Sequence, residues 1–460
     1  MSMHTEAFSR CNLRTTSAAG VLLAVGALAA MHPVAAQQPP ASVPPEGGVT
    51  LVLEAGTQSL VKLAFPRLER RESLSGTAHP AADELEATLR ADLVEARIFD
   101  IQGPAELSVL TLTGDRAHDH EQIRSLGNEI LLSGALLREG DRLVLEATLL
   151  TLANGKSILG KRYRGSFDLA RHMAHTFADE IVSYFTGRPG IARTTIAFSS
   201  DRDQAGRKEI YLMDYDGLNQ RRLTAHRSTS MSPAWTLDGL GVAYTSFFNG
   251  TPAVYFAEVA TGRKTPISTE GRFNASPSPS PDGRKVAFAR SLDGNVEIFV
   301  ADRDGRNARQ LTHSSAIDTN PAWSPKGNEL AFTSSRAGSP QIYVMDPEGT
   351  NLRRVTFDGE YNDNAAWSPD GTRIAYSSRR NGRFHIAVTD IVTLETKVLT
   401  SGTGSNEDPS FSPDGKRLVY AVKQGAGKQL WVMDAETGAN ARQLTSAGNN
   451  DSPSWSPYPQ

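Results

Sequence analysis

The chain has 460 residues, which is long for one ordinary compact domain, so its length favours two domains or one large repeat architecture. Its composition is that of a globular protein, and 48 basic against 51 acidic residues leave a formal net charge of −3. A chain so nearly balanced gives no electrostatic reason to expect nucleic acid as a partner, and we expect none.

Residues 1–36 are typical of an export signal. Arg10 and Arg14 precede an apolar run of 14 residues, and Val34-Ala35-Ala36 supplies the small residues that a signal peptidase reads. We therefore expect cleavage near Ala36. The apolar run is shorter than the roughly 20 residues of a membrane-spanning helix, so no transmembrane segment is expected in the mature protein.

The only cysteine is Cys11, which lies inside this leader. The mature chain is then free of cysteine, and an exported protein without disulfides fits a bacterial periplasm. Residues 37–48 are Pro-rich and without pattern, which predicts a flexible linker.

Two sequence patterns recur with a period of 44 residues. An aromatic residue or its substitute precedes a Ser-Pro-Asp-Gly type of turn at Trp235, Pro279, Trp323, Trp367, Phe411 and Trp455. An acidic residue closes a strand-like run at Asp214, Glu258, Asp302, Asp346, Asp390 and Asp434. Each repeat reads as four antiparallel strands joined by tight turns, and four-stranded units of this length predict a β-propeller. The repeated aromatic residues are expected to pack between adjacent blades.

The two chain ends determine the number of blades. The last aromatic position, Trp455, has no strand after it, and the first acidic position, Asp214, has no aromatic partner before it. We therefore expect the C-terminal strand to complete the blade that begins near Thr194. This predicts an all-β six-bladed β-propeller over residues 190–460, closed by strands from both chain ends.

Residues 49–189 lack this period and predict an α/β N-terminal domain. Strands are expected at 50–55 and 61–66, helices at 80–96 and around 119–127, and a β-meander over 129–166. A last amphipathic helix is expected over 168–187, ended by Gly187.

No cluster of residues predicts catalysis, a metal site or a cofactor. His118, Asp119, His120 and Glu121 lie close together, but at the solvated start of a helix. His172 and His175 have zinc-compatible spacing without a third ligand, which favours a surface or domain-contact role. The "DRDG" and "DYDG" segments resemble calcium loops, but their Gly comes too early, and no Gly-x-Ser-x-Gly motif is present.

The start of each inner strand predicts a polar ring at one mouth of the propeller channel. Its members stand three residues before each aromatic position, at Ser232, Ser276, Asn320, Asn364, Asp408 and Ser452. One residue earlier stand Met231, Ala275, Thr319, Asp363, Glu407 and Asp451. Such a ring fits a partner loop. The alternative is that the protein is a propeller module that binds a small ligand or calcium, or an enzyme whose site lies in the channel.

The whole arrangement resembles the TolB family of periplasmic proteins. The resemblance is carried by "ADEIVSYFTGRPGIARTTIAF", repeats of the "PAWSPDGTRIAYSS" and "IYVMD" kind, and the terminal "PSWSPYP". It implies a non-enzymatic, monomeric member of the Tol-Pal system, which serves outer-membrane integrity and envelope constriction at cell division. It also implies that the mouth binds the peptidoglycan-associated outer-membrane lipoprotein (Pal) and that the N-terminal segment contacts the inner-membrane protein TolA. The implied lipoprotein-binding positions are Ser232, Phe273, Asn274, Ser276, Thr319, Asn320, Asp363, Asn364, Glu407, Asp408, Asp451 and Ser452. The implied TolA-binding strand contains Leu51, Val52, Leu53 and Glu54.

Overall fold

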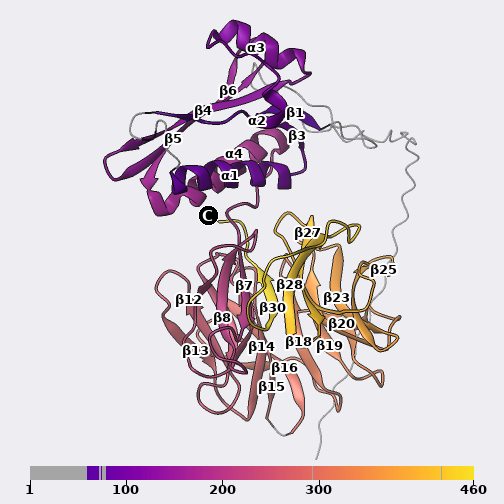
Figure 1. Ribbon diagram of the computed structural model, residues 1–460. Coiled ribbons are helices and arrows are strands. Elements are labelled where there is room, and N and C mark those ends of the chain that lie inside the picture. Colours follow the sequence, from indigo (N-terminus) through magenta and orange to yellow (C-terminus); the bar gives the residue numbers. More distant parts are fainter. Residues whose placement is uncertain (1–59, 72–73, 75–78, 293, 426, 460) are drawn as a thin grey trace, which may run out of the picture. The chain divides into compact units, whose positions relative to one another are not determined.

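A computed structural model of the protein describes residues 60–71, 74, 79–292, 294–425 and 427–459 (Figure 1). The predicted leader, the linker, the strand at 50–55 and the TolA-binding strand Leu51–Glu54 lie outside the described residues. No helix in the described part of the chain is long and apolar enough to cross a membrane.

The N-terminal region is a mixed sheet with helices on both faces. The sheet has the order β3-β1-β4-β5-β6, with β2 paired to β4. Its strands are β1 (Val61–Ala64), β2 (Glu69–Arg70), β3 (Phe99–Gln102), β4 (Ile130–Glu139), β5 (Arg142–Thr151) and β6 (Ser157–Ser166). Its helices are α1 (Pro80–Glu95), α2 (Pro104–Leu107), α3 (Arg116–Ser125) and α4 (Ala170–Thr186), the last preceded by a short 3-10 turn, Phe167–Leu169. The predicted helices and meander are present, whereas β2, β3 and α2 were not predicted.

The strand and helix sequences place two separate apolar layers on this sheet. Leucines of α1 and the apolar face of α4 pack with alternate residues of β4 and β5, such as Leu132 and Leu145. Leu107 of α2 and Ile123 of α3 pack on the opposite face with Leu131. This alternation follows from the two-residue period of a strand.

Helix α4 leads the chain from the sheet to the propeller. Its buried Met173, Phe177 and Ile181 recur every four residues, as the amphipathic pattern predicts. It ends at Gly187, whose φ of 66° is left-handed and whose N–H donates to the Ser183 carbonyl, 2.9 Å away. Asp179 then accepts hydrogen bonds from the backbone N–H groups of Ala192 and Arg193, which holds the connecting segment against the helix.

The rest of the chain forms six four-stranded antiparallel blades (Figure 1). Blade 1 contains β30 (Asn450–Trp455), β7 (Thr195–Ser200), β8 (Glu209–Asp214) and β9 (Arg221–Arg222), from the inside outward. Blade 2 contains β10 (Ser230–Trp235), β11 (Gly241–Ser246), β12 (Ala253–Glu258) and β13 (Lys264–Ser268). Blade 3 contains β14 (Phe273–Pro279), β15 (Lys285–Ser291), β16 (Val296–Asp302) and β17 (Arg309–Gln310). Blade 4 contains β18 (Asp318–Trp323), β19 (Leu330–Ser334), β20 (Gln341–Met345) and β21 (Arg353–Arg354). Blade 5 contains β22 (Tyr361–Trp367), β23 (Arg373–Arg380), β24 (Arg383–Asp390) and β25 (Thr396–Val398). Blade 6 contains β26 (Ser405–Phe411), β27 (Arg417–Gln424), β28 (Gly427–Asp434) and β29 (Arg442–Gln443).

Blade 1 closes the ring with strands from both ends of the propeller sequence. β30 pairs antiparallel with β7, with Trp455 opposite Ile196 and Asn450 opposite Ser200. The Trp455 indole Nε1 also donates to Thr194 Oγ1 over 2.8 Å. The predicted closure and the predicted fold class, an α/β region followed by a six-bladed propeller, are therefore confirmed.

The repeated tryptophans, which are expected to pack between adjacent blades, differ in how deeply they are buried. Trp455 is 6% exposed, but Trp235, Trp323 and Trp367 are only partly buried. Together with the turn prolines they line a cavity of about 480 Å³ at one end of the inner strands. The indole Nε1 of Trp235 donates to the Ser454 carbonyl of the preceding blade over 3.1 Å, so the aromatic position still joins neighbouring blades.

Candidate functional site

The inner strand of every blade is interrupted by a bulge at the same position. Pairing with the second strand shifts register there, for example between Asp363 and Ala366 of blade 5. The residue at each bulge has a left-handed φ of 50° to 58°, at Ser232, Ser276, Asn320, Asn364, Asp408 and Ser452. Bulges redirect side chains out of the regular alternation, and Asn and Asp tolerate positive φ better than most residues.

These six bulge residues line one cavity of about 180 Å³, together with the residue that follows each of them. The cavity lies on the propeller axis, because each of the six inner strands contributes to it. The structure thus brings together the ring that the 44-residue period predicts. We call this ring and the inner-strand residues up to three positions before it the channel mouth.

Hydrogen bonds join the mouth residues of successive blades into an arc. Asn320 Nδ2 donates to Asp363 Oδ1 and to Asn364 Oδ1, both over 2.7 Å. Asn364 Nδ2 in turn donates to Asp408 Oδ1, and the backbone N–H of Ser452 donates to Asp408 Oδ2 over 3.2 Å. The side chains are therefore held in place across blades 4, 5, 6 and 1.

Two lysines at the mouth were not predicted. Lys428 Nζ lies 2.7 Å from Glu407 Oε2, and Lys208 forms an ion pair with Asp451. The two lysines stand 220 residues apart, which is five periods of 44, so the repeat frame contained a signal for them. They neutralise two of the predicted carboxylates.

Asp408 has an unusual acidity. Its enclosure in the channel, followed by the nearby carboxylate of Asp451, raises the pKa of Asp408 to about 6. Lys428 acts in the opposite direction. Asp408 therefore changes charge between mildly acidic and neutral conditions.

Phe273 and Asn274 lie at the start of β14 but differ in exposure. Phe273 is partly exposed at the mouth, whereas Asn274 is 1% exposed. The Asn274 Oδ1 accepts from Arg290 Nε over 2.9 Å and from Ser268 Oγ over 2.7 Å. Asn274 is thus placed to support blade 3 rather than to touch a partner directly, and Leu51, Val52, Leu53 and Glu54 lie outside the described residues.

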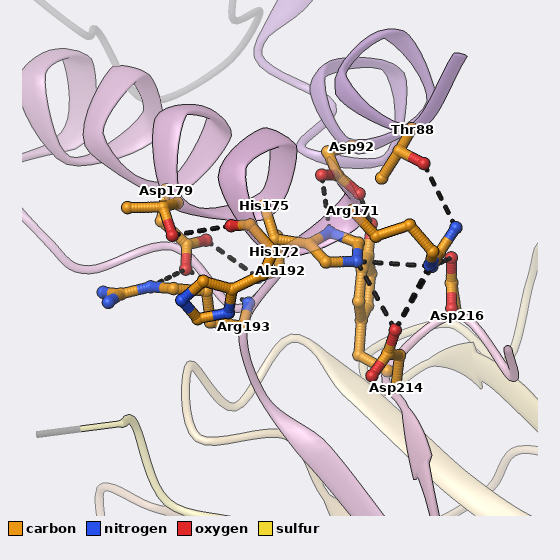
Figure 2. A network of polar contacts seen from close by, with 12 residues as sticks. Thr88, Asp92, Arg171, His172, His175, Asp179, Ala192, Arg193, Asp214 and Asp216 are labelled. Carbon is orange, nitrogen blue, oxygen red and sulfur yellow. Dashed lines mark hydrogen bonds and ion pairs between the residues drawn. The ribbon is translucent and has the colours of Figure 1, made fainter. Parts of the chain in front are cut away.

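A second polar cluster joins the α/β region to blade 1 (Figure 2). His175 Nδ1 lies 2.8 Å from Asp92 Oδ2 of α1, and His175 Nε2 lies 3.6 Å from Asp214 Oδ2 at the end of β8. Arg171, one helical turn earlier, contacts Asp216 Oδ2 over 2.6 Å and donates to Thr88 Oγ1 over 3.1 Å. A surface or domain-contact role was predicted for the α4 histidines, and His175 lies at a domain contact.

The electrostatics of this cluster favour a charged imidazole. Burial opposes protonation of His175, but its hydrogen bonds to Asp214 and Asp92 prevail and raise the pKa of His175 to about 9. Burial acts to raise the pKa of Asp214, but its hydrogen bond with His175, together with the charges of His175 and Arg171, lowers that pKa overall. Arg171, His175 and Asp214 therefore form ion pairs at neutral pH, whereas burial raises the pKa of Asp92 against the effect of its hydrogen bond with His175.

The other histidine candidates do not form a metal site in the described part of the chain, where no group of three or more His, Cys, Asp or Glu side chains is placed to hold an ion. Asp119 accepts from the backbone N–H groups of Thr113 and Gly114, which fixes the loop before α3. His118 Nε2 lies 2.9 Å from Gln122 Nε2, one helical turn along.

The mouth and the domain contact lie at opposite ends of the same blade. In blade 1, Asp451 lies opposite Ser199, and Ser200 pairs with Glu209. At the other edge Thr195 pairs with Asp214, which belongs to the domain contact. The mouth is thus the end of the channel farther from the contacts with the α/β region.

The fold and the mouth define a class of protein: an α/β region followed by a six-bladed propeller with a hydrogen-bonded polar channel mouth. The sequence profile of the TolB β-propeller domain matches residues 182–459, so the chain belongs to the TolB β-propeller family. It is 33% identical over 221 residues to the protein TolB homolog of Chlorobium chlorochromatii (strain CaD3), covering 48% of this chain and 49% of that protein. It is 38% identical over 190 residues to the Tol-Pal system protein TolB of Desulfosudis oleivorans (strain DSM 6200 / JCM 39069 / Hxd3), covering 41% and 42%.

The chain thus spans about half the length of the curated relatives it matches. Its structure is similar over a longer range to the crystal structure of TolB from Acinetobacter baumannii. That match has a TM-score of 0.73 and 28% sequence identity, and it covers 87% of this chain and 97% of the other. The likeness therefore includes the α/β region as well as the propeller.

Proposed function

We propose that this chain is a non-enzymatic, periplasmic component of the Tol-Pal system whose channel mouth binds the peptidoglycan-associated outer-membrane lipoprotein. In this role it would contribute to outer-membrane integrity and to envelope constriction at cell division. The observation that carries the proposal is the mouth itself: six inner strands present a ring of hydroxyl, amide and carboxylate side chains around one open cavity. Family membership and the similarity to a Tol-Pal system protein support it.

The chemistry of the mouth suits a protein loop. Its polar side chains are fixed by hydrogen bonds such as Asn320 to Asp363, so little side-chain entropy is lost when a partner binds. The residues that follow the bulges are mostly prolines, including Pro233 and Pro321, which stiffens the backbone of the ring. A rigid polar rim around a cavity can receive a protruding loop without rearranging.

The export signal read from residues 1–36 supports the periplasmic location, and the proposed monomer follows from the family resemblance. Contact of the inner-membrane protein TolA with Leu51–Glu54 is part of the same proposal. Its support is the sequence resemblance alone.

The proposal is tested by calorimetric titration of the purified mature chain with the soluble domain of the cognate lipoprotein. We expect saturable one-to-one binding, which is abolished when Asp363→Lys and Glu407→Lys are combined. The matched control is Val392→Lys, because Val392 is 83% exposed on the turn between β24 and β25, at the edge away from the mouth. Absence of binding by the wild-type chain would refute the proposal, as would equal binding by the double variant.

A further inference from the structure

The outermost position of the mouth is chemically different on its two sides. This position recurs every 44 residues, at Thr229, Phe273, Ile317, Tyr361, Ser405 and Asn449. It is apolar or aromatic on blades 3, 4 and 5 and polar on blades 6, 1 and 2. In a six-bladed ring each blade lies opposite the blade three places along. At this position Phe273, Ile317 and Tyr361 therefore each face a polar side chain across the channel.

The position two residues further inward shows a related asymmetry. Its members on blades 2, 3 and 4 are Met231, Ala275 and Thr319, none of which carries a charge. Those on blades 5, 6 and 1 are the acids Asp363, Glu407 and Asp451. Each acid stands 132 residues, or three periods, after an uncharged residue, and therefore lies directly across the channel from it.

The apolar side of the mouth is exposed to solvent. Ile317 is 55% exposed, and the neighbouring turns of blades 2 and 3 add Phe248 at 54% and Leu292 at 49%. Phe248 and Leu292 also share one repeat position, 44 residues apart. Exposed large apolar side chains that gather on one rim favour burial against a partner, at roughly 25 cal/mol per Å².

The acidic side keeps a net negative charge after its internal ion pairs are formed. Lys208 and Lys428 neutralise Asp451 and Glu407, one to one. Among the described residues, the hydrogen bonds to Asp363 come from neutral groups, including Thr333 Oγ1 at 2.7 Å and Tyr361 OH at 3.3 Å.

Asp408 also lacks an ion-pair partner. Among the described residues no lysine, arginine or histidine lies within ion-pair distance of Asp363 or Asp408. The acidic side therefore carries two carboxylates without a cation, and a basic side chain complements them.

We infer that the channel mouth holds its protein partner in one orientation, with an apolar side chain of the bound loop over Phe273 and Ile317 and a basic side chain over Asp363 and Asp408. The occupant is a single loop of a protein partner that presents an apolar residue toward blades 3 and 4 and a basic residue toward blades 5 and 6. The inference rests on the proposed function, since it describes the chemistry of the lipoprotein loop that the mouth receives.

The apolar side is tested with Ile317→Asp, measured by calorimetry against the soluble lipoprotein domain. Because Ile317 is largely exposed, the substitution leaves the blade core intact, and we expect affinity to fall about tenfold. Val392→Asp is the matched control, an exposed apolar residue at the opposite edge, and we expect it to bind like wild type. Equal effects of the two substitutions would overturn the inference.

The acidic side is tested by the salt dependence of binding. Wild-type affinity is expected to fall as ionic strength rises from about 0.05 to about 0.5 M, and the combined Asp363→Asn and Asp408→Asn variant should bind more weakly and with a smaller salt dependence. Tighter binding by that variant would mean an acidic partner loop and would overturn the inference. A wild-type chain that does not bind the lipoprotein at all refutes the proposed function instead.

The orientation is tested by photo-crosslinking from positions 273 and 405, which share one repeat position on opposite sides of the mouth. A benzophenone amino acid at 273 is expected to attach to an apolar residue of the lipoprotein loop. The same group at 405 is expected to attach beside a lysine or arginine of that loop. Crosslinks from positions 273 and 405 to the same residues of the lipoprotein loop would contradict a fixed orientation.

Discussion

His175 and Asp92 connect the two long helices of the α/β region at the point where both meet blade 1. The imidazole Nδ1 of His175 on α4 lies 2.8 Å from the Asp92 carboxylate on α1, and its Nε2 faces Asp214 of the propeller (Figure 2). Tyr215 adds a hydrogen bond from its hydroxyl to Asp92 Oδ1 over 2.8 Å. One side chain thus joins two helices and a blade.

This arrangement predicts how stability depends on pH. The folded-state pKa of His175 is raised from 6.5 to about 9, so its stabilisation is fully present below about pH 6.5 and is lost as pH rises through about 9. Thermal unfolding measured from neutral pH to about pH 10 should show this loss. His175→Leu should remove that pH dependence and lower the free energy of unfolding at pH 7 by about 3–5 kcal/mol, because it leaves Asp92 buried without its cation.

His172 supplies the control for that experiment. It lies on the same helix, but burial and the neighbouring charge of Arg193 lower its pKa. His172→Gln should therefore leave the loss of stability near pH 9 unchanged. An alkaline transition that persists in His175→Leu would assign the effect to another group.

The closure of the ring predicts unequal effects of two tryptophan substitutions. Trp455 is 6% exposed and its Nε1 donates to Thr194, whereas Trp323 is partly exposed and its Nε1 has no partner among the described residues. Trp455→Ala should destabilise the protein by about 3–5 kcal/mol, and Trp323→Ala by clearly less. Urea unfolding measures the loss of unfolding free energy in each variant. Equal losses would argue against a special role of β30 in closing the ring.

Two glycines in turns, Gly305 and Gly250, differ in how closely other backbone atoms approach them. A Cβ on Gly305 would lie 2.1 Å from the Ile267 carbonyl oxygen of blade 2, and its φ of 87° is left-handed. Gly250 has a similar φ of 85° with no atom within 4 Å of such a Cβ. Gly305→Ala should therefore lower the melting temperature more than Gly250→Ala, which carries only the backbone strain of about 1 kcal/mol. Equal shifts in melting temperature would mean that the backbone around Ile267 can move away from the added methyl group at little cost in stability.

Asp408 predicts a second pH effect, with its own window. Its folded-state pKa is raised from 3.8 to about 6, so its protonated form stabilises the fold below about pH 3.8 and this contribution is lost as pH rises through about 6. Asp408→Asn should therefore be more stable than wild type at pH 7.5, by on the order of 1–2 kcal/mol, and the difference should shrink near pH 4. Calorimetric melting at the two pH values checks this, and a variant less stable than wild type at pH 7.5 would contradict it.

The period of 44 residues carried most of the information about the propeller. It predicted six blades, the closing strand and the bulge residues that line the channel, because each blade must repeat the same pairing to bury its faces. It did not predict the partial exposure of Trp235 and Trp367, since a repeat position does not determine how wide the channel opens.

The features that the sequence did not predict depend on tertiary packing. The strand β3 has only four residues and gains its hydrogen bonds from β1, which lies far before it in the chain. The contact of His175 with Asp92 and Asp214 joins three distant segments, none of which has a local pattern that indicates it. Lys208 and Lys428 share a repeat position with four uncharged residues, so their role becomes visible only beside the carboxylates they neutralise.

The most direct test of the central claim is hydrogen–deuterium exchange of the chain with and without the soluble lipoprotein domain. We expect the partner to slow exchange at the starts of the inner strands, around Phe273, Thr319, Asp363 and Glu407. We expect no change at the opposite opening lined by Trp235 and Trp323. Protection confined to that opposite opening, or to the α/β region, would contradict the assignment of the channel mouth as the binding surface.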